Sequence, residues 1–479
     1  MSTRPLVVDL DGTLIHTDML HESALRVLRD KPWDTLYIPV WLAGGKALLK
    51  QRLALRSSFD PAGLPYNLDF LAWLREQRAG GRTLVLCTAA DASIAEAIAQ
   101  HLGLFDEVIA SDGRTNLSGR HKADALAARY GARGFDYAGN SRADLPVWER
   151  AHGAVVVNAS AALARQARTL CEVERIFPPP RVGFTGWRRA LRLHQWLKNL
   201  LLFVPLAAGH RFDDAGAWLR LLLAFFAFSL CASAVYVAND LMDLESDRRH
   251  PRKRERGFAS GHIPVWRGVV LAPVLLAGGF ALAAQVSQAF LGWMGLYFLA
   301  TCAYSWGLKR IVLVDCLLLA MLYTLRIVAG TAAAQLQFSF WLLAFSVFLF
   351  LSLAFVKRYA ELALQAGAGV EAPHGRGYRS SDSPLLQTMG VTSGYAAVLV
   401  LALYINSASV QYLYRAPELV WGTLPLVLFW ISRMWMKAHR GQMHDDPLVF
   451  AVKDVPSLIA GLLFGGVLAL GAVGWPWSA

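Results

Sequence analysis

Four polar side chains at the end of an apolar run could hold a metal-bound diphosphate. The sequence AVYVANDLMDLESD places Asn239, Asp243 and Asp247 four residues apart, with Asp240 beside them. On a helix, a spacing of four stacks side chains on one face. Carboxylates that share a face next to hydrocarbon repel one another unless a cation joins them, and Mg²⁺ prefers a few carboxylates together with substrate phosphates. These residues predict a Mg²⁺ and diphosphate site, with a solvated helix end as the alternative.

Cations near the ends of other apolar runs could bind further phosphate oxygens. Arg326 falls near the middle of such a run, where a charge is costly, so it either pairs with Asp315 on the same helix face or meets a ligand. Charge-assisted hydrogen bonds from such cations suit phosphates. The other candidates of this kind are Lys198, Lys309, Arg310, Lys357 and Arg358. The acids of HDDPLVFAVKD, which are Asp445, Asp446 and Asp454, are predicted to lie at the same cytoplasmic ends.

A second set of polar residues follows apolar runs in the N-terminal part. LVVDLDGT ends in Asp9 and Asp11, and TLVLCTAAD contains Thr88 at the end of another run. Such runs indicate buried parallel strands. Ligands of open α/β sheets bind at the carboxyl ends of strands. The residues that could join this site from later segments are Lys122, Asn140 and Asp144.

The elements that must position these residues differ between the two parts of the chain. Residues 1–180 carry 21 Lys/Arg and 20 Asp/Glu, whereas residues 181–479 carry 26 and 15, and hold +11 of the net charge of +12. The mean hydropathy of +0.37 is too high for an ordinary soluble chain of this length. We predict an α/β Rossmann-like domain over 1–175 and an all-α membrane domain over 187–479. The five cysteines form no CxxC pair, so they indicate neither a disulfide framework nor a zinc site.

Nine apolar segments of the second part approach the length that spans a bilayer. They are 194–209, 217–238, 265–285, 289–306, 312–334, 338–356, 391–410, 418–436 and 456–475. Every second connection is rich in Lys and Arg, including Arg376, and the positive-inside rule places these connections in the cytoplasm. The N-terminus carries no signal peptide, which puts the first domain on the same side. We expect a multi-pass protein of the bacterial inner membrane, with its C-terminus outside.

Two shorter segments organise the N-terminal part. Residues 19–66 are mostly helical in pattern and predict a small cap over the strand-end site. Within them, TLYIPVWLAGG is apolar but too short to span, so it is either cap core or a surface that leans on the membrane. The Pro-rich residues 176–186 predict a stiff linker. The basic run HPRKRERG indicates phosphate or anionic lipid beside a bilayer, and no nucleic-acid partner is expected.

The motifs of the membrane part resemble a known family. NDLMDLESD fits the NDxxDxxxD motif of the UbiA superfamily of membrane prenyltransferases. RLHQWLKNLLLFVPL, YSWGLKR, YTLRIVAG, KRYAEL and DPLVFAVKD follow in order and resemble its decaprenyl-phosphate phosphoribosyltransferase branch. The resemblance implies a nine-helix bundle that moves phosphoribose from phosphoribosyl diphosphate to a polyprenyl phosphate. KRYAEL stands where ordinary prenyltransferases have a second Asp-rich motif, and this exchange of acids for cations suits a reaction with several phosphates.

The N-terminal motifs resemble the haloacid dehalogenase superfamily of phosphatases. The resemblance implies that Asp9 is a nucleophile that forms an aspartyl phosphate and that Asp11 is the general acid and base. It also implies that Thr88 and Lys122 bind phosphoryl oxygens. Mg²⁺ would be held by Asp9, Asp144 and the carbonyl of Asp11.

One position departs from that family pattern, which covers about residues 4–160. Gly139-Asn140 stands where the family usually has Gly-Asp. An amide oxygen of Asn140 can still ligate Mg²⁺, but it brings no charge. The domain is therefore either an active phosphatase or a degenerate scaffold.

The two resemblances together favour a bifunctional enzyme that uses Mg²⁺. Its membrane domain would make a 5-phosphoribosyl lipid, and its phosphatase would remove the 5-phosphate to give polyprenyl phosphoryl ribose, a lipid-linked precursor for cell wall or glycan synthesis. The alternative is a prenyltransferase with an aromatic acceptor and a regulatory or degenerate phosphatase-like domain. A transporter or scaffold is disfavoured, because transporters hold their ionisable groups nearer the bilayer midplane. The oligomeric state stays open.

Overall fold

The computed structural model describes residues 4–366, 377–443 and 446–474. The contacts within the chain divide it into two compact units. The first consists of residues 1–191 and 236–272, and the second of residues 192–235 and 273–479. The segment that carries the acidic motif therefore belongs to the same unit as the N-terminal domain.

The first unit is built on a six-stranded parallel sheet with the order β3-β2-β1-β4-β5-β6. Its strands are β1 Leu6–Val8, β2 Leu84–Asp91, β3 Glu107–Ser111, β4 Asp136–Gly139, β5 Gly153–Val157 and β6 Glu172–Phe177. In the centre of the sheet, Leu6 pairs with Leu84 on one side and with Asp136 on the other. The predicted α/β Rossmann-like fold is confirmed, and the carboxyl ends of β2 and β4 flank that of β1.

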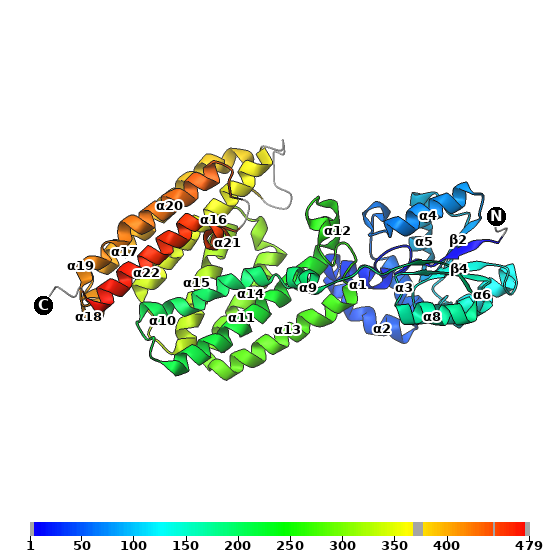
Figure 1. The fold of residues 1–479 in the computed structure, drawn as a ribbon, viewed down its shortest axis with the longest axis horizontal. Helices are drawn as coiled ribbons and strands as arrows, with labels where there is room; N and C mark the ends of the chain where they lie inside the picture. Colours follow the sequence, from blue (N-terminus) through cyan, green and yellow to red (C-terminus); the bar gives the residue numbers. More distant parts are fainter. Residues whose placement is uncertain (1–3, 367–376, 444–445, 475–479) are drawn as a thin grey trace. The chain divides into compact units, whose positions relative to one another are not determined.

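Helices cover both faces of this sheet, which explains why its strands are apolar throughout. Leu6 and Val8 share a core with α4 and α5, whereas Val7 shares a core with α6, α7 and α8 (Figure 1). The bounds of these helices are α4 Leu68–Ala79, α5 Ala92–Leu102, α6 Arg120–Tyr130, α7 Leu145–Arg150 and α8 Ala161–Leu170, with the short 3₁₀ helix η3 Arg142–Asp144 before α7.

The predicted cap is helical. Its elements are α1 Met19–Asp30, η1 Pro32–Tyr37, α2 Ile38–Ala43, α3 Lys46–Ala54 and η2 Pro61–Gly63. In its apolar stretch, Trp41 is buried at 8% exposure, but Leu36 and Val40 are 70% and 66% exposed, and the neighbouring Trp33 is 80% exposed. The interpretation of this stretch as cap core is therefore wrong for most of its side chains, which form an exposed apolar surface.

The rest of the first unit surrounds the acidic motif. Its elements are α9 Phe184–Ala190, the last turns of α11 Ala215–Met242, α12 Leu244–Arg249, η5 Lys253–Glu255 and the first turns of α13 Val265–Val286. Leu241, Leu244, Phe258 and Ile263 form one small core among these segments. Leu25 of α1 packs against that core, so the cap helix is part of it.

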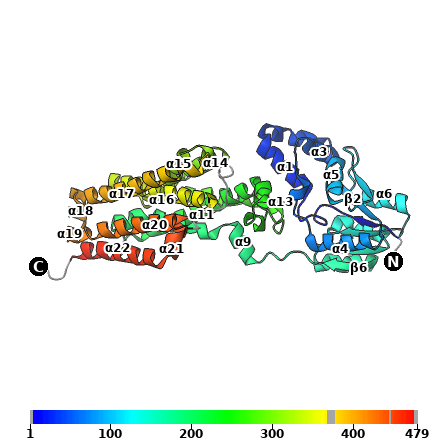
Figure 2. The same cartoon turned by 90° about the horizontal axis from the view of Figure 1, so that it is seen from above.

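The second unit is entirely helical among its described residues. Besides most of α11 and α13, it contains η4 Leu193–Phe203, α10 Val204–Ala208, α14 Gln288–Trp306, η6 Leu308–Arg310, α15 Val314–Ala334, α16 Phe340–Ala366, η7 Ser380–Asp382, α17 Ser383–Ile405, α18 Ala408–Leu413, α19 Pro417–Val420, α20 Thr423–His439, α21 Pro447–Lys453 and α22 Val455–Val473. Helices α15, α16, α17, α20 and α22 pack as successive neighbours (Figure 2). This arrangement confirms an all-α bundle.

Seven helices of the described chain are long and apolar enough to cross a membrane. They are Ala215–Met242, Val265–Val286, Val314–Ala334, Phe340–Leu364, Ser380–Ile405, Pro417–His439 and Val455–Val473. The predicted span at 194–209 consists instead of η4 and the short α10, and α14, which covers 289–306, is not among the seven. The protein therefore has the helices of a multi-pass membrane protein, while the count of nine stays a prediction. The C-terminal end, whose side was predicted, and Arg376 lie outside the described residues.

Candidate functional site

The carboxyl ends of three neighbouring strands bring the predicted phosphatase residues together. Asp9 directly follows β1, Thr88 lies on β2, and Asn140 directly follows β4. Thr88 is fully buried, and its Oγ1 accepts a hydrogen bond of 3.0 Å from the backbone N of Ala90. The strand-end site that the sequence predicted is therefore present.

Lys122 of α6 reaches this site across the sheet. Its Nζ lies 2.7 Å from Oδ1 of Asp9 and 2.9 Å from the hydroxyl of Tyr137. Burial alone would lower the pKa of Lys122, but Asp9 and other neighbours raise it above its ordinary value, so the side chain stays charged. A fixed ammonium at this point can attract a phosphoryl group to Asp9.

The two acids after β1 have different protonation states at neutral pH. Burial raises the pKa of Asp9 to about 6, although Lys122 opposes the rise. Burial and then the nearby Asp18 raise the pKa of Asp11 to about 8, although the backbone N of Met19 donates a hydrogen bond of 2.9 Å to Oδ1. At pH 7, Asp9 is ionised, as a nucleophile must be, and Asp11 is protonated, as a general acid must be. Two carboxyl groups with separated pKa values can divide nucleophilic and acid–base work.

Asp144 has several hydrogen-bond partners of its own. Its Oδ2 accepts bonds from the backbone N of Asn140 at 3.0 Å, the backbone N of Ser141 at 2.9 Å and Oγ of Ser141 at 3.1 Å, and its Oδ1 accepts one from Tyr137 at 2.9 Å. Asp144 therefore shapes the loop after β4. Its predicted role as a metal ligand stays a prediction.

The phosphatase site fits a divalent cation. Asp9, the Asp11 carbonyl and the amide of Asn140 are oxygen donors of the type that Mg²⁺ takes. The side chain of Asn140 lies against Gly12, whose φ of +74° permits the close approach of the loop after β1. Burial is the main cause of the raised pKa of both acids, and a neighbouring carboxylate adds to it, Asp144 for Asp9 and Asp18 for Asp11. Nevertheless, no three His, Cys, Asp or Glu side chains form a metal-binding group in the part of the chain that the structure describes.

Lys50 of the cap also belongs to this site, although the sequence did not single it out. A pocket beside Asp11 is lined by Lys50 and Leu53 of α3, by residues of α1 and by Asp91 at the end of β2. Nζ of Lys50 donates to the Ala89 carbonyl at 2.6 Å. The helical cap carried no motif, so only the folded arrangement reveals this second cation.

The acidic motif keeps a helical spacing across the end of α11. The backbone N of Asp243 donates to the Asn239 carbonyl at 2.9 Å, and the backbone N of Asp247 donates to the Asp243 carbonyl at 2.8 Å. These bonds continue the turn from α11 into α12. The backbone therefore keeps the helical repeat on which the predicted stacking of these side chains depends.

A guanidinium lies between two carboxylates of the motif and compensates the repulsion between them. Nη1 of Arg256 lies 3.1 Å from Oδ1 of Asp240 and 2.7 Å from Oδ2 of Asp247, and both acids are buried. Nζ of Lys253 lies 3.8 Å from the other oxygen of Asp247. The carboxylate and amide oxygens of the motif fit Mg²⁺, while Arg256, 32% exposed, balances their charge here.

In the second unit, two predicted cations meet at one carboxylate. Nζ of Lys198 on η4 lies 2.8 Å from Oδ2 of Asp446, and Nζ of Lys357 on α16 lies 3.2 Å from the same atom. The hydroxyl of Tyr323 donates to both oxygens of Asp446, at 3.0 and 2.9 Å. Three of the polar residues that the sequence placed near the ends of apolar segments, Lys198, Lys357 and Asp446, therefore lie together. Asp445 lies outside the described residues, and Asp454 pairs with Arg433 at 2.9 Å.

Arg326 is buried in the bundle, and the ion pair with Asp315, one of the two alternatives for this residue, is not formed. Its guanidinium donates to Oδ1 of Asn199 at 3.0 Å, to the Leu322 carbonyl at 2.7 Å and to the hydroxyl of Tyr297 at 2.9 Å. Because these acceptors are neutral, they do not compensate the positive charge of Arg326. Arg326 also lies over the ring of Tyr323, the residue that holds Asp446.

Arg358 pairs with Asp315, which was considered as an alternative partner for Arg326. Its Nη2 lies 2.5 Å from Oδ2 of Asp315, and it also pairs with Glu361. The side chain is 1% exposed, so it forms a buried structural ion pair. The sequence could not choose between the two arginines because both lie on apolar helices. Phosphate binding by Arg358, and by Lys309 and Arg310 on η6, stays a prediction.

Comparison with known proteins identifies both parts of the chain. The UbiA prenyltransferase family matches residues 200–455, and the haloacid dehalogenase-like hydrolases match residues 6–149. The Sinorhizobium fredii protein called "Uncharacterized protein y4nM" is 40% identical over 469 residues, 97% of this chain and 90% of its own. Nodulation protein NoeC of Azorhizobium caulinodans is 39% identical over 296 residues, 60% of this chain and 95% of its own.

A third relative carries an enzyme name. The decaprenyl-phosphate phosphoribosyltransferase of Mycolicibacterium smegmatis is 31% identical over 282 residues, which make up 58% of this chain and 89% of that protein. The relative from Sinorhizobium fredii, in contrast, is similar over both parts. The chain therefore belongs to the UbiA prenyltransferase family and carries a haloacid dehalogenase-like hydrolase domain ahead of its membrane part.

Proposed function

We propose that the protein transfers 5-phosphoribose from phosphoribosyl diphosphate to a polyprenyl phosphate and then removes the 5-phosphate. The observation that carries this proposal is the cluster at Asp446. Two lysines share this one carboxylate, and Arg326 lies over the ring of Tyr323, whose hydroxyl donates to the same carboxylate. Two lysines on one carboxylate leave positive charge, which supports the binding of further anions such as phosphates. The similarity to enzymes named decaprenyl-phosphate phosphoribosyltransferase supports the choice of substrates.

In the transfer step, an oxygen of the lipid phosphate attacks C1 of the ribose, and the bond from C1 to the diphosphate breaks. Asn239, Asp243 and Asp247, with Asp240, would hold Mg²⁺, which when bound supplies positive charge to the departing diphosphate. Lys198, Arg326 and Lys357 would bind phosphate groups of donor and acceptor. These residues orient the reactants rather than change their protonation.

In the second step, Asp9 attacks the 5-phosphate of the lipid-linked product, and Asp11 gives its proton to the ribose oxygen that leaves. Lys122 and Thr88 bind the phosphoryl oxygens, and Asp9, Asn140 and Asp144 would hold Mg²⁺. Asp11 then takes a proton from water, which attacks the aspartyl phosphate and releases phosphate. The separated pKa values of Asp9 and Asp11 support this division of roles.

The test uses the full chain in lipid, with labelled phosphoribosyl diphosphate and a polyprenyl phosphate, and mass spectrometry of the lipid extract. Wild type should yield polyprenyl phosphoryl ribose. Asp9→Asn should accumulate the 5-phosphorylated lipid because the nucleophile is lost, while Asp243→Ala, the control, should yield neither. If wild type and Asp9→Asn both yield the same phosphorylated lipid, this result would contradict the phosphatase step. Activity with a prenyl diphosphate and an aromatic acid, but not with these substrates, would instead show a prenyltransferase.

A further inference from the structure

Helix α12 needs support from other parts of the fold. It has only six residues, Leu244–Arg249, and although it continues the turn from α11, a helix this short is unstable in water without further contacts. Yet it carries Asp247, a carboxylate of the acidic motif that is 1% exposed. The rotation of α12 determines where that carboxylate points. Contacts that fix α12 therefore also fix part of the proposed transferase site.

One of these contacts comes from the phosphatase domain. On α12, Arg248 places Nη2 at 2.6 Å and Nη1 at 3.2 Å from the two carboxylate oxygens of Glu22 on α1. The two side chains are 6% and 2% exposed. Nε of Arg248 also donates to the Ala259 carbonyl at 2.8 Å, so this arginine ties α12 to the loop that follows it. A bidentate pair fixes direction as well as distance.

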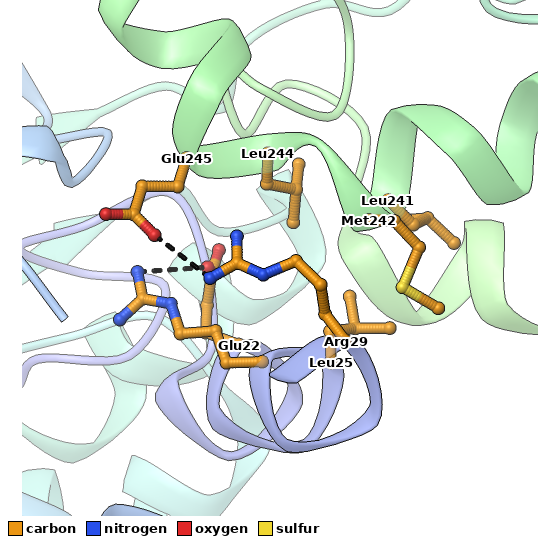
Figure 3. Close-up of a pocket in the computed structure, with 8 residues that line it drawn as sticks. Glu22, Leu25, Arg29, Leu241, Met242, Leu244 and Glu245 are labelled. Atoms are coloured by element: carbon orange, nitrogen blue, oxygen red, sulfur yellow. Dashed lines mark hydrogen bonds and ion pairs between the residues drawn. The ribbon is translucent and has the colours of Figure 1, made fainter. Parts of the chain in front are cut away.

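Further contacts hold the same two helices together. Leu25 of α1 packs against the small core that contains Leu241 and Leu244, and these three residues line one pocket with Glu22 and Glu245 (Figure 3). At its edge, the guanidinium of Arg29 reaches Oε2 of Glu245 at 3.4 Å. An apolar contact and two ion pairs thus join α1 to α12.

Glu22 is held from the phosphatase side as well. Its Oε1 accepts a hydrogen bond of 2.7 Å from the hydroxyl of Thr17. Burial would raise the pKa of Glu22, but Arg248 and Thr17 outweigh this effect and lower it, so the carboxylate is charged. Removing one partner of a buried pair leaves the other charge uncompensated, which costs more than an exposed pair would. Nη2 of Arg26 on α1 also lies 4.0 Å from Oε2 of Glu22, so Arg248 is the nearer of two cationic partners of this carboxylate.

We infer that Glu22, a residue of the phosphatase cap, is a positioning residue for the transferase reaction. It acts through Arg248, which fixes α12 and with it the carboxylate of Asp247. The inference rests on the proposed transfer of phosphoribose. It gives the phosphatase domain a second role that does not depend on its own catalysis, namely to hold the acidic motif in shape.

The test compares Glu22→Gln, Arg248→Gln and the double variant in the full chain. Each single variant should lower the kcat of transfer at least tenfold while the KM for polyprenyl phosphate changes less than threefold, because α12 is misplaced but the lipid cations are intact. The double variant should be no worse than either single variant, as expected for residues that act as a pair. Hydrolysis of p-nitrophenyl phosphate should stay within twofold of wild type, since Asp11 meets α1 through the backbone of Met19.

Hydrogen exchange supplies a readout that does not depend on activity. The peptide covering residues 243–250 should exchange at least tenfold faster in Glu22→Gln, while the strands of the sheet keep their protection. The matched control is Asp60→Asn, which removes the exposed pair with Arg249 at 3.3 Å and should change neither transfer nor exchange. Asp9→Asn should abolish phosphatase activity and leave transfer intact.

Three outcomes would overturn the inference. One is full transfer by Glu22→Gln, another is an unchanged exchange of residues 243–250, and the third is an equal loss of transfer and phosphatase activity, which indicates general damage to the fold. A wild-type chain that makes no phosphoribosyl lipid would instead contradict the proposed function. The exchange measurement still tests the link between Glu22 and α12 in that case.

Discussion

At the scale of single residues, Asp9 and Asp11 show how burial assigns chemical roles. They lie one residue apart at the end of β1, yet their pKa values are about 6 and about 8. The difference arises because Lys122 contacts Asp9 directly, whereas Asp18 is the main charge that opposes ionisation of Asp11. The sequence predicted both residues from the DLDGT pattern. Their separation depends on burial and neighbours, which no local pattern contains.

The raised pKa of Asp9 predicts a pH dependence of metal activation. Below pH 6 the folded protein binds a proton at Asp9, and Mg²⁺ must displace it, whereas above about pH 7 the carboxylate is already free of the proton. As the pH rises towards 6, the Mg²⁺ concentration for half-maximal hydrolysis of p-nitrophenyl phosphate should therefore fall about tenfold per pH unit. Above pH 7 it should become constant. A requirement that stays constant from pH 5 to pH 7 would contradict this role of Asp9.

The amide at position 140 predicts a second effect on the same site. Asn140→Asp places a negative side chain at the end of β4, in the same site as Asp9. A charged oxygen holds Mg²⁺ more tightly than an amide oxygen does. We expect the Mg²⁺ concentration for half-maximal hydrolysis to fall about fivefold to tenfold at pH 7.5. The same metal titration of wild type and variant measures it. An unchanged requirement would mean that this side chain does not contact the metal.

At the scale of elements, the apolar helices of the bundle present polar groups from separate segments to one another. η4 supplies Lys198, α15 supplies Tyr323, α16 supplies Lys357, and Asp446 precedes α21. Hydropathy placed Lys198, Lys357 and Asp446 at or near the ends of apolar segments, whereas Tyr323, in the middle of α15, was not singled out from the sequence. It could not pair Asp315 with Arg358 instead of Arg326, because the partner depends on which helix faces lie together. Nor could it predict that Arg256 bridges two acids of the motif.

Removal of one lysine tests the cluster at Asp446. Lys357→Met should raise the KM for phosphoribosyl diphosphate or for polyprenyl phosphate about tenfold to a hundredfold, because a lost cation–phosphate contact costs a few kcal/mol. Steady-state kinetics with each substrate varied in turn will identify the phosphate that Lys357 binds. The control is Lys437→Met at the exposed end of α20, where the lysine donates a hydrogen bond of 2.7 Å to Gln442. Equal effects of both substitutions would remove Lys357 from the site.

At the scale of the whole molecule, the order of the two domains was predictable and their boundary was not. The motifs of each family are local in sequence, so they identify the phosphatase part and the membrane part without knowledge of the fold. The pair of Glu22 and Arg248 joins positions 226 residues apart, and no sequence periodicity reports such a contact. As a result, residues 236–272 belong by sequence to the membrane part and by contacts to the first unit.

The exposed apolar surface of the cap also determines how the N-terminal domain behaves when it is produced alone. Trp33, Leu36 and Val40 lie on a stretch of η1 and α2 that is mostly open to solvent. In a free fragment of residues 1–180, which keeps β6 and the core residue Phe177, this surface would face water, and exposed apolar patches promote self-association at high protein concentration. Colloidal instability of such a fragment would thus reflect its surface rather than a poorly formed core, and polar substitutions at these three positions are the rational way to make it soluble.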